Sequence, residues 1–263
     1  MQTCTVSLAS RALGRQILIT IILPPGYDQS SESYPVLYLN DGQDFERLRM
    51  KATLETAFKE NHVPRIMVVG IHANERRLHE YGTAHQADYQ GRGNLAAQHT
   101  AFVTRELMDF IENSYRVKTE PADRAFAGFS LGGLSALDIA WNHDHLFSKV
   151  GVFSGSLWWR SKAYQDGYDD YNDRIMHVQI RNSPRKPNLK FWLEAGTDDE
   201  KDDRNGNGII DAIDDTLDLM HELRIKGYQD GKDFAYVEVP GGQHNPDTWG
   251  AIMPQFLQWA FPV

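Results

Sequence analysis

The segment of residues 124–141 constrains this chain more than any other, and it reads RAFAGFSLGGLSALDIAW. Its apolar start, residues 125–127, suits a buried strand, and a Gly-x-Ser-x-Gly turn centred on Ser130 follows. Beyond the turn, one face of a helical pattern carries Leu134, Leu137 and Trp141. A strand, a sharp turn that carries a serine and a helix together form the arrangement known as a nucleophile elbow.

The glycines around Ser130 have a steric reason in such a turn. Side chains at Gly128 and Gly132 would collide with the neighbouring strand and helix, and Gly133 lets the helix begin close to the sheet. The N-terminus of the helix also directs its positive end toward the serine. Because a free serine hydroxyl is a poor nucleophile, the motif predicts a base and an acid elsewhere in the chain.

The composition favours a single large α/β domain. The chain has 263 residues, 41% of them hydrophobic and 24% charged, which is an ordinary globular balance. A net charge of −9 without a basic patch argues against nucleic acid as a partner. The single cysteine, Cys4, excludes an internal disulfide, and we expect it to pack within an edge strand. No apolar run reaches transmembrane length and no signal pattern is evident, so we expect no membrane association and a cytoplasmic location.

Strand and helix patterns alternate along the chain. Two antiparallel strands are expected first, at residues 3–8 and 15–23. Further strands are expected at 35–40, 65–71, 149–153, 189–194 and 234–239, and helices at 51–61, 95–115, 170–181, 216–226 and 248–261. This alternation predicts an α/β fold with a mostly parallel central sheet and helices on both faces.

Three strand ends carry side chains that suit catalysis, and in parallel sheets active groups lie at the carboxyl ends of strands. Ser130 follows one strand, Asp198 and Asp199 follow the strand at 189–194, and His244 follows the last strand. The order serine, acid, histidine is that of α/β-hydrolases. We expect His244 to remove the Ser130 proton and one of the two aspartates to hold the imidazole.

A reaction at Ser130 also needs donors for the developing oxyanion. The backbone N–H of Leu131, directly after the serine, is one expected donor. The second should come from the turn after the strand at 35–40, where Gln43 and Gly42 are the candidates.

Five motifs are spread over most of the chain: LPPGY at 23–27, YPVLYLNDGQ at 34–43, GFSLGG at 128–133, FSGSLWW at 153–159 and GGQH at 241–244. Together they resemble the putative-esterase family of α/β-hydrolases, which includes esterase D, enterochelin esterases and feruloyl esterases. The resemblance implies an α/β-hydrolase fold without a separate lid domain. The family pattern Gly-Thr-x-Asp implies Asp199, rather than Asp198, as the acid.

Residues 203–214 read DRNGNGIIDAID and fit a calcium-binding loop, with oxygen side chains and a central glycine at the expected positions. The expected ligands are Asp203, Asn205, Asn207, Asp214 and the backbone carbonyl of Ile209. Residues 195–215 carry eight acidic and two basic side chains, and a cation would relieve their repulsion. A solvated acidic turn is the alternative. In the calcium hypothesis, the ion is structural and holds Asp199 in position.

We therefore expect a serine esterase that acts on a small-molecule ester through an acyl-enzyme intermediate, without a catalytic cofactor. An acyltransferase that uses the same three residues, thioester hydrolysis, and a calcium-dependent binding protein with a vestigial site are the alternatives.

Aromatic and basic side chains outside the triad are candidates for substrate contact. Trp158 and Trp159 are expected to line a substrate pocket or, equally, to pack in the core. The segment 72–94 has no clean period, and its His72, Arg77 and Tyr81 are expected at the surface.

Overall fold

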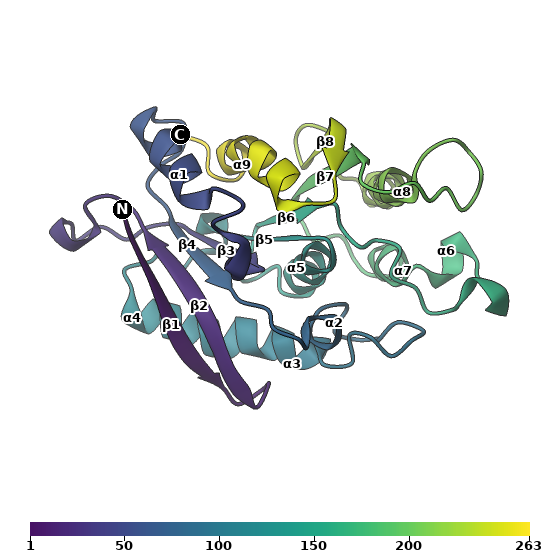
Figure 1. Cartoon of the computed structure of the whole chain (residues 1–263), viewed down its shortest axis with the longest axis horizontal. Helices are drawn as coiled ribbons and strands as arrows, with labels where there is room; N and C mark the ends of the chain where they lie inside the picture. Colours follow the sequence, from purple (N-terminus) through teal and green to yellow (C-terminus); the bar gives the residue numbers. More distant parts are fainter.

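The computed structural model describes all 263 residues and contains one eight-stranded sheet (Figure 1). The strand order is β1-β2-β4-β3-β5-β6-β7-β8. The β1–β2 and β2–β4 pairs are antiparallel, and all other pairs are parallel. The strands are β1 (Gln2–Ser10), β2 (Arg15–Leu23), β3 (Val36–Asn40), β4 (Met67–Ile71), β5 (Arg124–Phe129), β6 (Lys149–Phe153), β7 (Lys190–Asp198) and β8 (Phe234–Gln243).

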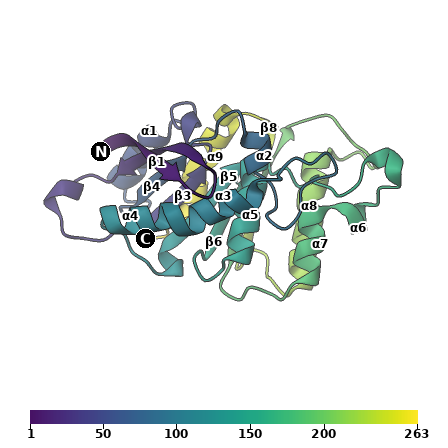
Figure 2. The ribbon, with the colours of Figure 1, turned by 90° about the horizontal axis from the view of Figure 1, so that it is seen from below.

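Helices lie on both faces of the sheet, so the expected layered α/β architecture is confirmed (Figures 1 and 2). Alternate residues of β5 point into two separate cores, with Ala125 and Ala127 in one and Phe126 in the other. α1 and α9 close the first core; the helical segment from α3 to α4, with α5, α7 and α8, closes the second. The helices are α1 (Met50–Lys59), α2 (Arg77–Glu80), α3 (Ala96–Ala101), α4 (Met108–Ser114), α5 (Leu131–Asn142), α6 (Asp170–Asp173), α7 (Ile175–Asn182), α8 (Asp211–Ile225) and α9 (Pro246–Ala260).

Two expected helices are interrupted. A π-helical segment, Phe102–Leu107, joins α3 to α4 and buries Phe102, Val103 and Leu107. The helix expected at 170–181 is divided at Arg174, whose backbone is extended. The side chain of Arg174 is buried and pairs with acidic residues of α8, so a tertiary ion pair accompanies the break.

The strands at the end of the chain are longer than the sequence pattern predicts. β7 extends to Asp198, and β8 continues through Pro240 and the Gly-Gly pair to Gln243. Gln243 pairs with Asp198 after a register shift between Gly196 and Asp198. The residues that directly follow these two strands, Asp199 and His244, are therefore brought to the same point.

β1 is an edge strand, as expected, but Cys4 does not pack in the interior. The side chain is exposed, and its nearest polar neighbour is the Tyr115 hydroxyl at 4.0 Å. The expectation of a packing role was wrong because β1 is the edge strand and its first four residues, Cys4 among them, are exposed. No helix in the structure is both long enough and apolar enough to span a membrane.

Candidate active site

The backbone at Ser130 forms the sharp turn that the motif predicts. Ser130 has φ 53° and ψ −124°, a conformation that residues other than glycine rarely adopt. Its N–H donates to the carbonyl of Phe153 at 2.8 Å, and its carbonyl accepts from the N–H of Ser156 at 3.1 Å and of Gly133 at 3.0 Å. The strained residue is thus held on both sides by backbone hydrogen bonds, and it remains partly exposed.

The glycines of the elbow permit close backbone contacts. A Cβ atom on Gly128 would overlap the carbonyl of Gly132, and one on Gly132 would lie 2.6 Å from Oδ2 of Asp41. The first contact fixes the angle between β5 and α5. The second brings the turn after β3 against the first turn of α5.

His244 and Asp199 meet at the carboxyl ends of β8 and β7. The distance from Nδ1 of His244 to Oδ2 of Asp199 is 3.6 Å. The Asp199 side chain is fully buried, whereas that of His244 is 41% exposed. Neither carboxylate oxygen of Asp199 has a hydrogen-bond partner, so the nearby imidazole is the natural donor to this buried carboxylate. Asp198 is exposed and forms no ion pair with His244.

No hydrogen bond joins Ser130 to His244 in this structure. The hydroxyl of Ser130 instead lies 3.4 Å from that of Ser156, a buried residue in the turn after β6. Sequence reasoning missed Ser156 as part of the site. Its only signal is its position in the FSGSLWW motif, at the end of the strand beside the elbow.

The indole of Trp249, on α9, packs edge-on against the imidazole of His244, with ring centroids 5.2 Å apart at 83°. Its Nε1–H donates to the hydroxyl of Ser154 at 2.9 Å. Ser154 in turn contacts Glu194, a buried residue of β7. Burial, assisted by the nearby negative charge of Asp199, raises the pKa of Glu194 to about 8.

The turn after β3, where the second oxyanion donor is expected, lies against the elbow. Asn40 donates from Nδ2 to the carbonyl of Gly132 at 2.9 Å. Gly42 packs so closely on the backbone of Gly70 that a Cβ there would overlap it. The side chain of Gln43 donates to Asp41 at 3.1 Å and accepts from the N–H of Ala73 at 3.0 Å. Because this side chain is engaged, the oxyanion donors that this turn can offer are the backbone N–H groups of Gly42 and Gln43.

Arg77 and Tyr81 support this turn from the segment after β4. Arg77 pairs with both carboxylate oxygens of Asp41 at 2.8 Å, and it also donates to the carbonyl of Phe129 at 3.3 Å. Tyr81 is buried, and its hydroxyl accepts from the N–H of Asp41 at 3.3 Å. The expectation of a surface position was wrong for Tyr81 because a buried, positive-φ Asp41 requires partners that a sequence pattern does not show.

The two tryptophans after β6 have different environments. Trp159 is fully buried, and its indole packs against Gly82 and Gly93. It therefore belongs to the core, which is the second of the two equal expectations for this residue, and it does not line a substrate pocket. Trp158 is partly exposed and lies beneath the guanidinium of Arg92, 5.1 Å from its ring centroid, so it alone of the two is accessible.

The loop of residues 203–214 folds around the side chains expected to bind calcium. The carboxylate of Asp203 accepts from the backbone N–H groups of residues 206, 207 and 208. Asp214 accepts from the side-chain amides of Asn205 at 2.7 Å and Asn207 at 3.3 Å. Two carboxylates and two amide oxygens thus belong to one small region, a donor set whose chemistry fits calcium. No group of three or more His, Cys, Asp or Glu side chains is placed to hold a metal ion.

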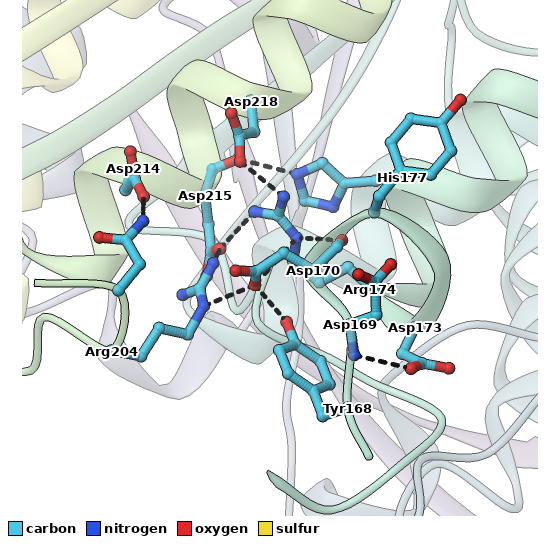
Figure 3. A network of polar contacts seen from close by, with 12 residues as sticks. Tyr168, Asp169, Asp170, Asp173, Arg174, His177, Arg204, Asp214, Asp215 and Asp218 are labelled. Carbon is cyan, nitrogen blue, oxygen red and sulfur yellow. Dashed lines mark hydrogen bonds and ion pairs between the residues drawn. The ribbon is translucent and has the colours of Figure 1, made fainter. Parts of the chain in front are cut away.

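Ion pairs centred on the buried Asp215 anchor this loop to the rest of the domain (Figure 3). Arg204, in the loop, pairs with Asp170 of α6 at 2.7 Å and with Asp215 of α8. Asp215 also pairs with Arg174 at 2.6 Å, and Arg174 pairs with Asp218 at 2.5 Å. Part of the acidic charge in this region is therefore balanced by two arginines of the chain itself.

Comparisons with known proteins agree with this fold. A family model described as "Putative esterase" matches residues 10–260. The uncharacterized protein YbbA of Bacillus subtilis (strain 168) is 31% identical over 246 residues, which cover 92% of this chain and 91% of that protein.

Among solved structures, a ferulic acid esterase aligns with a TM-score of 0.75 at 20% identity, covering 99% of this chain and 98% of that chain. The enterobactin esterase FES from Shigella flexneri aligns with a TM-score of 0.76 at 20% identity, covering 99% of this chain and 58% of that one. At such identities these structures show the shared fold alone. The family match over nearly the whole chain shows that this protein belongs to the putative esterase family of α/β-hydrolases and is a carboxylic ester hydrolase.

Proposed function

We propose that the protein hydrolyses its ester through a Ser130–His244–Asp199 triad and an acyl-enzyme intermediate. The observation that carries the proposal is the contact between a fully buried, otherwise unpartnered Asp199 carboxylate and the exposed His244 ring, 3.6 Å apart. A buried carboxylate of this kind stabilises an imidazolium and fixes the tautomer whose Nε2 is free to accept a proton.

In the first half-reaction, the Ser130 hydroxyl oxygen attacks the ester carbonyl carbon while Nε2 of His244 accepts the hydroxyl proton. The carbonyl π-electrons move to the oxygen, which becomes the oxyanion. As the tetrahedral intermediate collapses, the bond to the alcohol oxygen breaks and the imidazolium protonates this leaving group. An acyl-Ser130 ester remains.

In the second half-reaction, His244 accepts a proton from a water molecule that attacks the acyl carbonyl. Collapse of this intermediate releases the acid and returns the proton to the Ser130 oxygen. The oxyanion would be stabilised by the N–H of Leu131, at the N-terminus of α5 where amides lack intrahelical partners. A second N–H, from Gly42 or Gln43, comes from the turn that Asn40 and Asp41 hold against the elbow.

The absence of a Ser130–His244 hydrogen bond is compatible with this mechanism, because catalytic hydrogen bonds are often long in unliganded enzymes. His244 is exposed and follows a strand end directly, so in this proposal its ring turns toward Ser130 when substrate binds. The Ser156 hydroxyl, 3.4 Å from that of Ser130, would serve as an interim partner of the nucleophile.

The test is labelling with a fluorophosphonate probe, combined with hydrolysis of a panel of short acyl, feruloyl and siderophore-type esters and an acyl thioester. Wild-type protein should be labelled and Ser130→Ala should not, and the same variant should lose hydrolysis of whichever ester is accepted. Ser156→Ala is the matched control, because it removes a neighbouring hydroxyl and should still be labelled. Labelling that persists in Ser130→Ala would overturn the assignment. Added alcohol that diverts most product into a new ester would favour the acyltransferase alternative.

We also propose that the loop of residues 203–214 holds a structural calcium ion through Asp203, Asn205, Asn207, Asp214 and the carbonyl of Ile209. In support, two carboxylates and two amides share the loop, and the loop follows Asp199 after only three residues. The ion would neutralise charge and stiffen the segment that carries Asp199.

Calcium should raise the melting temperature of chelator-treated protein, and the effect should be absent in Asp203→Ala. Asp233→Ala is a suitable control, because Asp233 is an acidic residue of a different loop. An unchanged melting temperature on addition of calcium, with no bound metal detected in the purified protein, would leave the loop as an acidic turn held by Arg204.

A further inference from the structure

We propose that Trp249 is a positioning residue for His244, and that a buried hydrogen-bonded chain through Ser154 to Glu194 fixes the indole. The inference rests on the proposed triad, because it assigns Trp249 a role only if His244 acts as the base. It adds three residues to the site that the serine motif and the GGQH motif do not include.

His244 needs such support because the structure restrains it weakly. The ring is 41% exposed, and its contact with Asp199 is 3.6 Å long. Asp199 approaches from β7 on one side of the imidazole. The indole of Trp249 contacts the ring edge-on, with centroids 5.2 Å apart. Together the carboxylate and the indole define the orientation of the imidazole, and either alone would leave it free to rotate.

The same indole contacts the strand that carries the nucleophile. Trp249 stacks on Phe129 with centroids 5.0 Å apart and an interplanar angle of 20°, and Phe129 directly precedes Ser130. Trp249 therefore lies between the strand that carries the nucleophile and the base. A change in its orientation would alter the distance between them, and displacements of about 1 Å can lower turnover by about 100-fold.

A buried hydrogen bond fixes the orientation of the indole. Nε1–H of Trp249 donates to the hydroxyl of Ser154 at 2.9 Å. Ser154 is buried and has φ 45°, an uncommon conformation for a residue other than glycine. Its N–H donates to the carbonyl of Glu194 at 2.9 Å. This backbone arrangement places the hydroxyl between the indole and the carboxyl group.

The chain of hydrogen bonds has a direction. Because the Ser154 oxygen accepts from Trp249, its own proton is free to donate to Oε2 of Glu194, 3.5 Å away. The side chain of Glu194 is buried, and its other oxygen has no partner. Burial and the charge of Asp199 raise the pKa of Glu194 to about 8, so the group is mostly neutral at pH 7. A neutral Glu194 leaves Asp199 as the negative charge beside the imidazole.

The test compares Trp249→Phe and Ser154→Gly with Trp259→Phe. Trp249→Phe keeps a ring but removes the donor. Ser154→Gly removes the hydroxyl and suits the positive φ, so folding should not suffer. Trp259 lies on the same helix and packs on Trp192 and Phe256, which makes Trp259→Phe the matched control. The first two variants should lower kcat about 10-fold with little change in KM, and the control should leave both unchanged.

Three further measurements separate positioning from packing. The double variant Trp249→Phe/Ser154→Gly should lose no more than either single variant, because both remove the same hydrogen bond. Glu194→Gln should retain activity, because the neutral amide keeps an oxygen that can accept from the Ser154 hydroxyl. Glu194→Leu removes this acceptor, and its kcat should fall as much as that of Ser154→Gly. An NMR titration of the His244 ring should differ from wild type in Trp249→Phe and not in Trp259→Phe.

Wild-type kcat in Trp249→Phe and Ser154→Gly, with an unchanged His244 titration, would overturn this inference. Lower melting temperatures with unaltered kcat in these two variants would also overturn it, because Trp249 and Ser154 would then contribute only to the packing of the core. Failure of the proposed triad is distinguishable, since in that case wild-type protein would itself resist fluorophosphonate labelling at Ser130.

Discussion

Ser130 and His244 lie at the same edge of the sheet, but the chain holds them in different ways. Ser130 is fixed by backbone hydrogen bonds to Phe153 and Ser156, and by the contact of Gly128 with the first turn of α5. His244 follows β8, at the end of the sheet, and its ring is restrained by the side chains of other elements.

This difference corresponds to the different demands on the two proposed catalytic residues. The nucleophile must sit in a strained conformation, and only dense backbone contacts can maintain strain. The base must change partners during the reaction, so it is held by side chains that permit small rotations. We therefore expect changes at the elbow to affect folding and activity together, and changes around His244 to affect activity first.

The largest effects should come from the reacting groups themselves. Ser130→Ala and His244→Ala should each lower kcat/KM by about 10⁴-fold or more, with melting temperatures near wild type. Because His244 is exposed, added imidazole should restore part of the activity of His244→Ala and none of that of Ser130→Ala. Steady-state kinetics with and without imidazole check this, and an equal response of the two variants would contradict the comparison.

Asp199→Asn should have the next largest effect. The amide cannot stabilise an imidazolium, and it favours the wrong tautomer of His244, so kcat should fall by about 10³-fold. Asp198→Asn is the control, because Asp198 is exposed and its neighbour Asp199 is the proposed acid. If the two variants lost activity equally, the assignment of Asp199 over Asp198 would fail.

Two glycine substitutions compare the stability of the two regions. Gly128→Ala would force a Cβ into the carbonyl of Gly132, and the free energy of unfolding should fall by about 3 kcal/mol. Gly241, close to His244, has φ 70° and open space around its Cα. Gly241→Ala should therefore cost only the strain of the left-handed conformation, about 1 kcal/mol. Urea denaturation of both variants measures the difference, and equal losses would refute the distinction.

The final comparison concerns the pH dependence of stability. The pKa of Glu194 is raised to about 8 in the folded state, so between about pH 4.5 and 8 the folded protein binds a proton that the unfolded chain releases. This contribution is complete below the unfolded pKa and is lost as pH rises toward 8. Glu194→Gln lacks this titrating group. As pH rises, the free energy of unfolding of wild type should therefore fall relative to that of the variant, by at most about 1.4 kcal/mol per pH unit. If the urea midpoints of wild type and Glu194→Gln changed by the same amount from pH 5 to 8, the pKa of Glu194 would not be raised.

Local sequence patterns predicted the elbow because its requirements are local. Gly128, Ser130 and Gly132 lie within five residues, and the strand and helix on either side have clear periods. The pairing of Asp199 with His244 was also predictable in outline, because each follows a strand of the same parallel sheet. The extension of β8 through Pro240 and two glycines was not, since these residues ordinarily end strands.

Side chains that act through others carried no local signal. Trp249 is one of six tryptophans, and nothing in the pattern of α9 distinguishes it from Trp259. Tyr81 and Arg77 lie in a segment without periodicity. Their role becomes visible only in the structure, where both contact the buried Asp41. Partners of this kind are chosen by distance in space, which a sequence does not record.

The sequence by itself determined the fold class, and it suggested the proposed nucleophile and the order of the three proposed catalytic residues, because these depend on short motifs and on alternating strands and helices. The tertiary structure decided which aspartate faces His244, which tryptophan is accessible, and what supports the imidazole. Those outcomes depend on the register shift between β7 and β8 and on the packing of α9. Both arise from contacts between residues distant in the chain.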